Sequence, residues 1–374
     1  MKRRSWLLLA GAGTGGALLL GYGLRAPTAA ERLGEADAAE LRLNAWLRIA
    51  ADGGVQIAMP RAEMGQGVHT ALAQLLAEEL DADWSRVSVV DVPVAKVYAN
   101  QALLLNVLPL QPGDEGAIAR FARGAGQRLG YWLHLQVTGG SSSVRDAWEP
   151  LRLAGASARA MLLQAAAQRW QLPLEQLRTE RGRVLTGDRS LGYGELAAAA
   201  AALTPPTQQA LKARADWRLI GKPVPRLDLP AKVDGSAVYG VDVQQPGQLH
   251  AALRHGPYLG GSLVRFDERA LLAEPGVRHA FVLKERVAVV VADRWWQAEA
   301  ALKKHPPRWE PGAKAAWTSE LIRAQLRRAL DQRDGFAFRR HGDAAAALAG
   351  GALRADYELP LLAHATLEPQ NATA

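Results

Sequence analysis

Hydrophobic and polar residues alternate in two short stretches near the start of the chain. The first stretch covers residues 43–49 and the second covers residues 55–59, with the turn Asp52-Gly53-Gly54 between them. A period of two on both sides of a glycine turn is typical of a β-hairpin. We therefore predict two antiparallel strands here.

After Pro60 the hydrophobic period lengthens to that of a helix. Leu72, Leu75, Leu76 and Leu80 recur at spacings of three and four, which places them on one helical face. An apolar run at residues 87–92 predicts the next strand. The predicted order is therefore a strand, a glycine-containing loop at residues 61–70, a helix and a strand.

Further along, the pattern predicts a mixture of short strands and helices, so the expected fold class is α+β. A strand pair is expected around Arg181-Gly182-Arg183, and a helix after Tyr193-Gly194-Glu195-Leu196. Thr204-Pro205-Pro206 interrupts the pattern and predicts a domain boundary. Strands are then expected at residues 241–243, 249–251 and 287–291, and helices at residues 295–302 and 317–330.

Composition excludes several classes of site. The chain has 374 residues with 49% hydrophobic and 22% charged residues, a globular balance, and no cysteine. A disulfide framework, a thiolate nucleophile, a Cys-ligated zinc and a Cys-ligated iron–sulfur cluster are therefore excluded within this chain. The net charge is +8, but most arginines are scattered among acids, so we expect a solvated basic surface and no nucleic-acid partner.

The first thirty residues have the organisation of an export signal. Lys2, Arg3 and Arg4 precede an apolar run from Trp6 to Leu24, and small residues follow at 26–30 as a candidate cleavage region. The Arg3-Arg4 pair resembles a twin-arginine signal, whose receptor handles proteins that fold around a cofactor before export. We expect a periplasmic protein, with membrane association as an open alternative.

Residues 11–16 also fit the pattern GxGxxG of a dinucleotide-binding fingerprint. A true fingerprint needs a second strand ending in an acid about 20 residues later. Residues 26–40 are instead rich in alanine and acids and hold no β-branched run. A flavin- or NAD-dependent oxidoreductase is therefore the less favoured interpretation, which cleavage near residue 30 would eliminate.

Two glycine loops that open helices are the candidate binding sites. Gly65, Gln66 and Gly67 precede the predicted helix, where free backbone N–H groups and the positive helix end suit a phosphate or a polar pterin edge. A plain tight turn is the alternative. The second loop consists of Thr138, Gly139, Gly140, Ser141, Ser142 and Ser143.

The second loop opens a helix that is expected to continue to about Trp170. Ser143 and Asp146 have the spacing of a capping box. Backbone N–H groups and serine hydroxyls at such a terminus can bind phosphates. A plain serine cap is the equally weighted alternative.

Both loops carry a family resemblance. Residues 63–70 (EMGQGVHT) with 75–80 (LLAEEL) resemble the pterin-contacting segment of the molybdenum hydroxylases, and residues 138–148 (TGGSSSVRDAW) resemble a cofactor loop of the isoquinoline oxidoreductase and bacterial aldehyde dehydrogenase branch. The resemblance implies a molybdopterin cofactor in its cytosine dinucleotide form. The stretch 103–135 is longer than the family pattern.

The resemblance extends to the later part of the chain. Residues 221–247 resemble the entry to the a/b hammerhead domain, and residues 357–374 resemble the family's first substrate-side loop. The expected domains are an export signal at 1–30, a molybdopterin-binding segment at 31–215, a hammerhead domain at 221–312 and the start of a second molybdopterin-binding domain at 313–374. Glu368 and Asn371 are candidates to lie near the cofactor.

The resemblance implies hydroxylation of an aldehyde or an N-heteroaromatic carbon, with oxygen from water and two electrons leaving through the metal. Electrons would pass to a small [2Fe–2S] subunit, with a cytochrome c subunit as a further candidate partner. No residue matches the family's catalytic glutamate, so we assign no catalytic residue and no metal ligand, and expect the chain alone to be inactive. The alternative is a truncated or split piece that acts only as an assembly partner.

Overall fold

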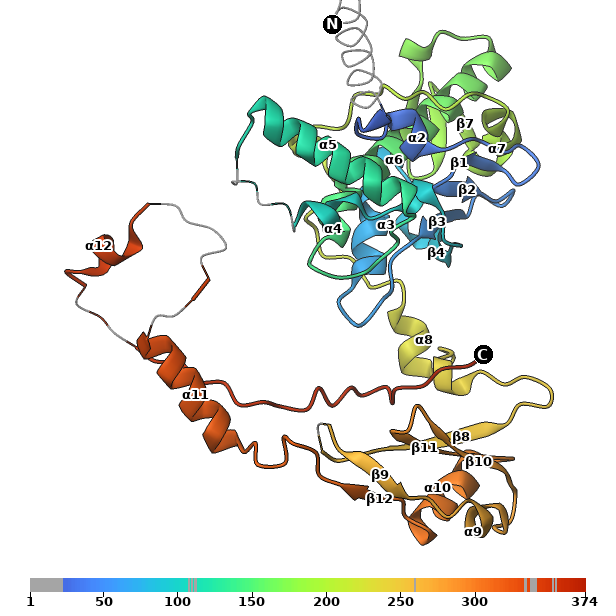
Figure 1. The fold of residues 1–374 in the computed structure, drawn as a ribbon. Coiled ribbons are helices and arrows are strands. Elements are labelled where there is room, and N and C mark those ends of the chain that lie inside the picture. Colours follow the sequence, from blue (N-terminus) through green and yellow to red (C-terminus); the bar gives the residue numbers. More distant parts are fainter. Residues whose placement is uncertain are drawn as a thin grey trace, which may run out of the picture. The chain divides into compact units, whose positions relative to one another are not determined.

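The computed structural model describes residues 23–374 apart from 107, 109, 111–112, 259, 333–334, 337–341, 352 and 354. The predicted twin-arginine segment and the glycines at 11–16 lie outside the described residues. The chain forms two compact units, the first ending at Ala237 and the second beginning at Val238 (Figure 1). Within the described part of the chain, no helix has the length and apolarity needed to cross a membrane.

A four-stranded sheet forms one side of the first unit. Its strands are β1 (Arg42–Asn44), β2 (Leu47–Ile49), β3 (Val55–Met59) and β4 (Val87–Asp91), hydrogen-bonded in that order. The β2–β3 pair is antiparallel, with Leu47 opposite Ile57, and confirms the predicted hairpin. The β3–β4 pair is parallel because α3 (Val68–Leu80) crosses between the two strands.

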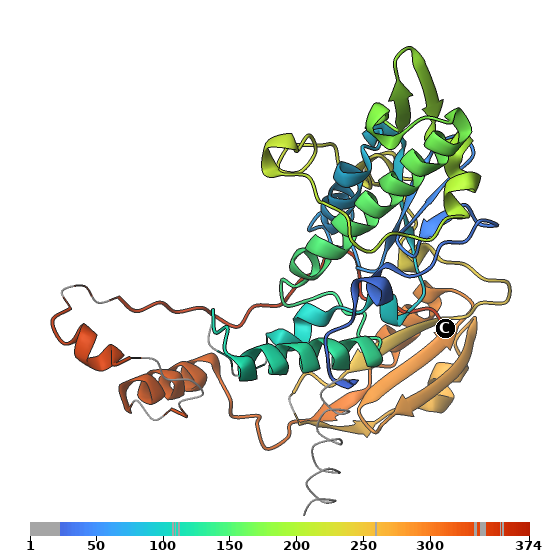
Figure 2. The same cartoon turned by 90° about the horizontal axis from the view of Figure 1, so that it is seen from above.

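The helices α3 and α6 (Ser143–Trp170) form the centre of the first unit. Figure 2 shows α6, in green, passing α3, in blue. All four predicted leucines of α3 are buried. Gly155 permits the close crossing, because a Cβ at this position would overlap the carbonyl oxygen of Leu76 and lie 3.0 Å from the Cβ of Glu79.

The rest of the first unit is built from short elements around this pair. The stretch 103–135 contains the end of α4 (Gln101–Leu105) and all of α5 (Ala117–Trp132). The predicted strand pair is a three-stranded sheet, β5 (Arg178–Glu180), β6 (Arg183–Thr186) and β7 (Arg189–Gly192), followed by the predicted helix α7 (Tyr193–Ala201). Short 3₁₀ turns lie at Trp84–Arg86, Lys96–Tyr98, Leu174–Gln176 and Arg214–Asp216.

The boundary predicted at Thr204-Pro205-Pro206 lies inside the first unit, which continues through α8 (Leu229–Asp234) to Ala237. The buried carboxylate of Glu78 holds this continuation, because it accepts hydrogen bonds from the backbone N–H groups of residues 218, 219 and 220 at 2.8, 2.6 and 3.1 Å. Burial alone would raise the pKa of Glu78, but these bonds and Lys212 outweigh it and lower the pKa.

The second unit contains two small antiparallel sheets. One has the order β10 (Val277–Leu283), β11 (Val287–Ala292), β8 (His250–His255), and the other pairs β12 (Arg308–Glu310) with β9 (Ser262–Arg265). The helices are α9 (Glu268–Leu272), α10 (Trp295–Lys304), α11 (Ser319–Gln332) and α12 (Ala344–Leu348). A small core of Ala252, Val290 and Leu302 joins the first sheet to α10.

One predicted strand of the second unit is wrong. Residues 241–243 do not form a strand, because Gly240–Asp242 is a 3₁₀ turn in which the Asp242 carboxylate accepts the backbone N–H of Tyr239 at 2.9 Å. The other expected strands and helices are confirmed. The helix expected at 317–330 is α11, which buries no residue.

We expect Gly155→Ala to lower the free energy of unfolding by about 1–3 kcal/mol, since an added methyl group in a closely packed crossing forces the two helices apart. Urea unfolding of the variant beside the parent measures this change.

Gly126→Ala is the matched control. It is also a helical glycine, but its Cβ would lie 3.5 Å from side-chain atoms of Leu105 and Leu108, an ordinary contact. Alanine favours the helix by up to about 1 kcal/mol there, so this variant should keep or gain stability. Equal stability of the two variants would contradict the close crossing of α3 and α6.

Candidate cofactor site

The two predicted loops lie side by side. We call residues 61–67 the first glycine loop and residues 138–143 the second glycine loop. The backbone N–H of Ala62 donates to the hydroxyl oxygen of Thr138 at 2.9 Å, across 76 residues of sequence. The structure therefore brings together two segments that the sequence singled out separately.

The helices behind these loops run in the same direction. Residues 61 and 146, 76 and 155, and 81 and 159 are in contact, in the same order along α3 and α6. Both helix N-termini, which carry partial positive charge, therefore lie at the same end of the pair. A helix start at this end that no carboxylate of the chain occupies would attract an anion.

A buried ion-pair network supports both loops. The carboxylate of Asp146 accepts hydrogen bonds from Arg61 at 3.0 Å and from Arg32 at 3.2 Å. Its other oxygen accepts the backbone N–H groups of Gln101 and Ala102 at 2.8 and 3.1 Å. The side chain of Asp146 is only 2% exposed, so the four donors replace its water.

The predicted capping box of Ser143 and Asp146 is therefore wrong. The residue that precedes α6 is Ser142, and it makes no side-chain capping bond. Asp146 instead binds the N-terminal N–H groups of α4. The sequence has the spacing of a capping box, but the Asp146 carboxylate accepts its hydrogen bonds from residues that lie far away in the sequence.

At the first glycine loop, a carboxylate of the chain already occupies the start of α3. Glu63 accepts the backbone N–H groups of Gly65 and Gly67 at 2.9 Å each, and of His69 at 3.2 Å. Burial alone would raise the pKa of Glu63, but these bonds outweigh it and lower the pKa. The donors expected to be free for a phosphate are largely used, which favours the tight-turn interpretation of this loop.

The glycines of the first loop are required by the backbone. Gly65 and Gly67 have φ values of 93° and 77°, which other residues rarely adopt. Gln66 between them is exposed, and its amide accepts from the N–H of Met64 and donates to the carbonyl of Ala62 at 3.0 Å. One amide N–H and one lone pair of Gln66 remain for a ligand.

The second glycine loop has a different character. Gly140 and Ser141 have φ values of 59° and 52°, and Ser141 is exposed. Ser142 is buried, and its hydroxyl donates to the carbonyl of Gly139 at 2.6 Å while accepting from the amide of Asn100 at 2.7 Å. Because no side chain caps α6, its first N–H groups are the better anion donors of the two helices.

The predicted residues thus divide into two groups. Thr138 and Ser142 hold the loops in place, whereas Gln66 and Ser141 are exposed and available to a ligand. Gly139 and Ser143 are half-buried. Three further residues support the loops: Arg32, Arg61 and Asn100. The local sequence pattern predicts neither their contacts nor the ion pairs of Asp146.

The other candidate residues, Glu368 and Asn371, do not extend the site. Glu368 and Asn371 are exposed residues of the second unit, and the amide of Asn371 donates to the carbonyl of Pro369 at 2.8 Å. Among the described residues there is no group of three or more His, Cys, Asp or Glu side chains that could hold a metal ion. The glycine loops are therefore the candidate site.

Comparison with known proteins shows what the chain is similar to. The molybdopterin cofactor-binding domain matches residues 16–101, a range that includes the first glycine loop. The beta subunit of isoquinoline 1-oxidoreductase from Brevundimonas diminuta is 38% identical over 67% of this chain and 33% of the relative. The chain is a homologue of this protein. The predicted resemblance is confirmed.

Two further relatives extend the match along the chain. A nicotinate dehydrogenase subunit of Pseudomonas putida is 30% identical over 90% of this chain and 26% of the relative. Membrane-bound aldehyde dehydrogenase (pyrroloquinoline-quinone) of Gluconacetobacter polyoxogenes is 28% identical over 88% of this chain and 40% of the relative. The chain spans between a quarter and two fifths of the length of these curated relatives.

We expect Glu63→Gln to lower the free energy of unfolding by about 1–2 kcal/mol at pH 7, because it removes the charge from the start of α3. The pKa of Glu63 is lowered in the folded chain from its ordinary value of 4.5. The difference between parent and variant is therefore fully present above pH 4.5 and is lost as the pH falls through the lowered value. Unfolding at pH 7 and pH 3 measures it.

Glu149→Gln, an exposed acid on α6, is the control and should be close to neutral at both pH values. A Glu63→Gln effect that stays the same at pH 3 would show that the charge of Glu63 does not stabilise the helix.

Proposed function

We propose that this chain is the molybdopterin-binding part of an oxidoreductase that hydroxylates aldehydes or N-heteroaromatics with oxygen from water. The homology to oxidoreductase subunits and the domain match over the first glycine loop support this proposal. The observation that carries it is the bond between Ala62 and Thr138, which joins both cofactor-type loops at the common end of two helices. The substrate class rests on the names of the relatives.

The two glycine loops differ in what they can offer to such a cofactor. A phosphate of the cytosine dinucleotide form would be held at the uncapped start of α6 by backbone N–H groups and Ser141. Gln66 would contact the cofactor with its remaining amide N–H and lone pair, because Glu63 closes the start of α3. When bound, the cofactor supplies the two-electron chemistry.

We propose that a partner subunit receives the electrons. Because the chain contains no cysteine, it cannot ligate a [2Fe–2S] cluster through thiolates, and a separate small [2Fe–2S] subunit is proposed for this step. Two relatives are named as subunits, which supports an assembly of several chains. A cytochrome c subunit is a further proposed partner.

The domain assignments follow from the same proposal. The first unit corresponds to the molybdopterin-binding segment, and the sheets of the second unit to the hammerhead domain proposed at 221–312. The exposed helix α11 would open the next molybdopterin-binding domain at 313–374. An amphipathic helix with no buried residue is consistent with a segment that packs against further structure.

Ser141→Asp tests the proposed phosphate site. Aspartate tolerates the positive φ of this position and suits a helix start, so the fold should be kept. Its charge repels a phosphate, so we expect molybdenum and acid-released cytidine monophosphate per chain to fall about tenfold, the equivalent of about 1.4 kcal/mol. Both are measured on the native assembly, by metal analysis and chromatography.

Ser141→Asn is the matched control, since it has the same shape as aspartate without the charge, and it should retain the cofactor. Equal loss or equal retention in both variants would contradict phosphate binding at α6. One relative is named for pyrroloquinoline quinone. Detection of that quinone with no molybdenum in the native assembly would overturn the cofactor assignment.

The alternative function is that of an assembly partner without turnover. It predicts a native polypeptide of about the 40.2 kDa of this chain that carries no molybdenum after purification. A longer native polypeptide that contains molybdenum supports the enzyme. The intact mass of the native chain, measured together with its metal content, separates these outcomes.

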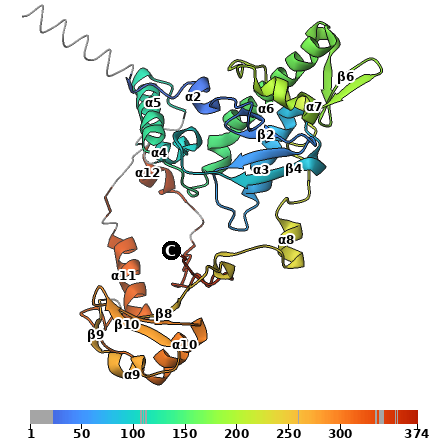
Figure 3. The same ribbon diagram turned by 90° about the vertical axis from the view of Figure 1, so that its right-hand side faces the viewer.

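We also propose export to the periplasm through the twin-arginine segment. The contacts of Arg128 with residues 25, 26 and 31 limit where a signal peptidase could cleave without disturbing the fold. Arg128 on α5 donates to the carbonyls of Arg25 and Ala26 at 2.7 and 3.2 Å and pairs with Glu31 at 2.8 Å. Figure 3 shows α5 beside α2 (Ala29–Leu33). Arg128 lowers the pKa of Glu31 to about 2.

We expect the N-terminus of the exported chain to lie before Arg25, because cleavage within residues 26–30 would remove partners of Arg128 and the N-cap Thr28 of α2. N-terminal sequencing of the periplasmic protein measures this position. A mature N-terminus at residue 30 or later would contradict the expectation.

A further inference from the structure

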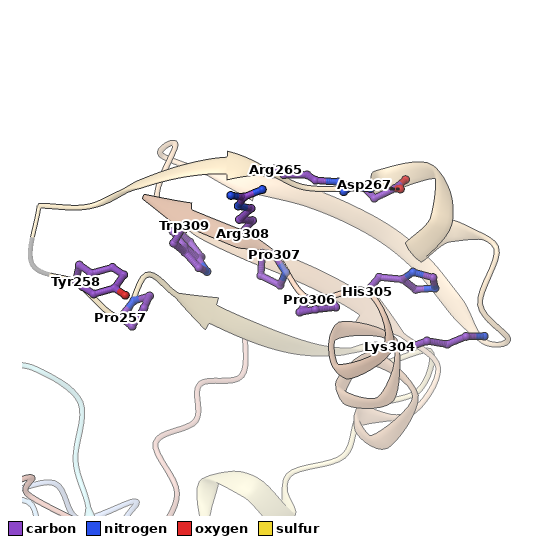
Figure 4. Close-up of a pocket in the computed structure, with 10 residues that line it drawn as sticks. All are labelled: Pro257, Tyr258, Arg265, Asp267, Lys304, His305, Pro306, Pro307, Arg308 and Trp309. Atoms are coloured by element: carbon purple, nitrogen blue, oxygen red, sulfur yellow. Dashed lines mark ion pairs between the residues drawn. The ribbon is translucent and has the colours of Figure 1, made fainter. Parts of the chain in front are cut away.

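The second unit contains a cavity that the proposed function does not use. It has a volume of about 570 Å³, and Tyr258, Arg265, Lys304, His305, Arg308 and Trp309 are among the residues that line it (Figure 4). The side chains come from the loop after β8, from β9, from the end of α10 and the residue that follows it, and from β12. Pockets of this size typically bind small molecules.

The charges around this cavity are not balanced. Arg308 on β12 lies directly opposite Arg265 on β9. Like charges at opposed positions destabilise a strand pair, and an isolated two-stranded ribbon is marginal to begin with. Asp267 lies 3.9 Å from Arg265, whereas Arg308 makes no ion pair within the described part of the chain. An anion between the two guanidinium groups would relieve this repulsion.

The other charged groups at the cavity do not pair with Arg308. Lys304 and His305 both contact Glu274, at 2.8 Å each. Asp267, the acid of the lining, also accepts the N–H of Ala270 and so caps α9. Because Asp267 pairs with Arg265, the positive charge without an ion-pair partner among the described residues is that of Arg308.

Aromatic side chains form a further part of the wall. Trp309 is half-buried, and a Cβ on Gly256 would lie 2.8 Å from its ring, so the backbone of Gly256 supports one side of the indole. Tyr258 is 45% exposed. Figure 4 shows Tyr258 and Trp309 at the same end of the cavity. A planar base stacks on such rings whatever its identity.

We propose that this cavity binds a nucleoside phosphate, with the phosphates on Arg265 and Arg308 and the base against Trp309 and Tyr258. Arginine suits this role because its planar guanidinium binds phosphate oxygens through two parallel hydrogen bonds. The site is independent of the glycine loops, which belong to the first unit.

Calorimetric titration of the full chain with adenosine diphosphate, without divalent metal ions and at low salt, tests the proposal. We expect saturable binding that weakens at higher salt, and a loss of at least about tenfold in Arg308→Gln, since a charged hydrogen bond is removed. The same variant should raise the melting temperature of the ligand-free chain, because it removes the opposed like charges. Weaker binding then cannot result from misfolding.

Arg286→Gln, an exposed arginine at the β10–β11 turn, is the matched control and should bind as the parent does. Trp309→Leu should weaken adenosine diphosphate about fivefold or more while leaving inorganic pyrophosphate unchanged. No saturable binding, or binding unaffected by Arg308→Gln, would overturn the site. Pyrophosphate binding as tight as that of the nucleotide would overturn the assignment of a nucleoside phosphate.

Discussion

The close crossing of α3 and α6 is the constraint on which the first unit depends. Gly155 lets the two helix backbones approach, and both glycine loops are the N-terminal entries to these same helices. The distance between the loops is therefore set by the packing of the helices behind them. A cofactor that contacts both loops would depend on this crossing even though it touches neither the leucine core nor Gly155.

Buried carboxylates extend this constraint to segments far apart in sequence. Asp146 joins Arg61 and Arg32 beneath the loops, and Glu79 accepts two hydrogen bonds from Arg152 at 2.9 and 2.7 Å near the other end of α3. Burying charge is costly unless each oxygen finds donors, and removing one partner of such a pair costs about 3–5 kcal/mol. Such networks add little to the net free energy of unfolding. Their main effect is to determine which segments of the chain pack together.

The two helix starts at the common end differ in a way that bears on the proposed chemistry. Glu63 neutralises the start of α3 from within the chain, while α6 begins without a side-chain cap. An anionic ligand is therefore directed to the second loop, and the first loop is left to offer the amide of Gln66. In the second unit, Arg265 on β9 pairs with Asp267, whereas the opposed Arg308 on β12 makes no ion pair within the described residues.

The local pattern by itself determined the hairpin, the strand–loop–helix–strand order and the buried leucines of α3, because periods of 2 and 3.6 are written in neighbouring residues. It also located both glycine loops, and the absence of cysteine excluded a thiolate-ligated cluster. Only the tertiary structure decided that Asp146 serves α4 and two arginines, that Glu63 fills the start of α3, and that residues 204–237 belong to the first unit. These outcomes depend on partners that lie far away in the sequence or that compete for the same polar group. Local periodicity cannot predict which of these partners forms the hydrogen bond.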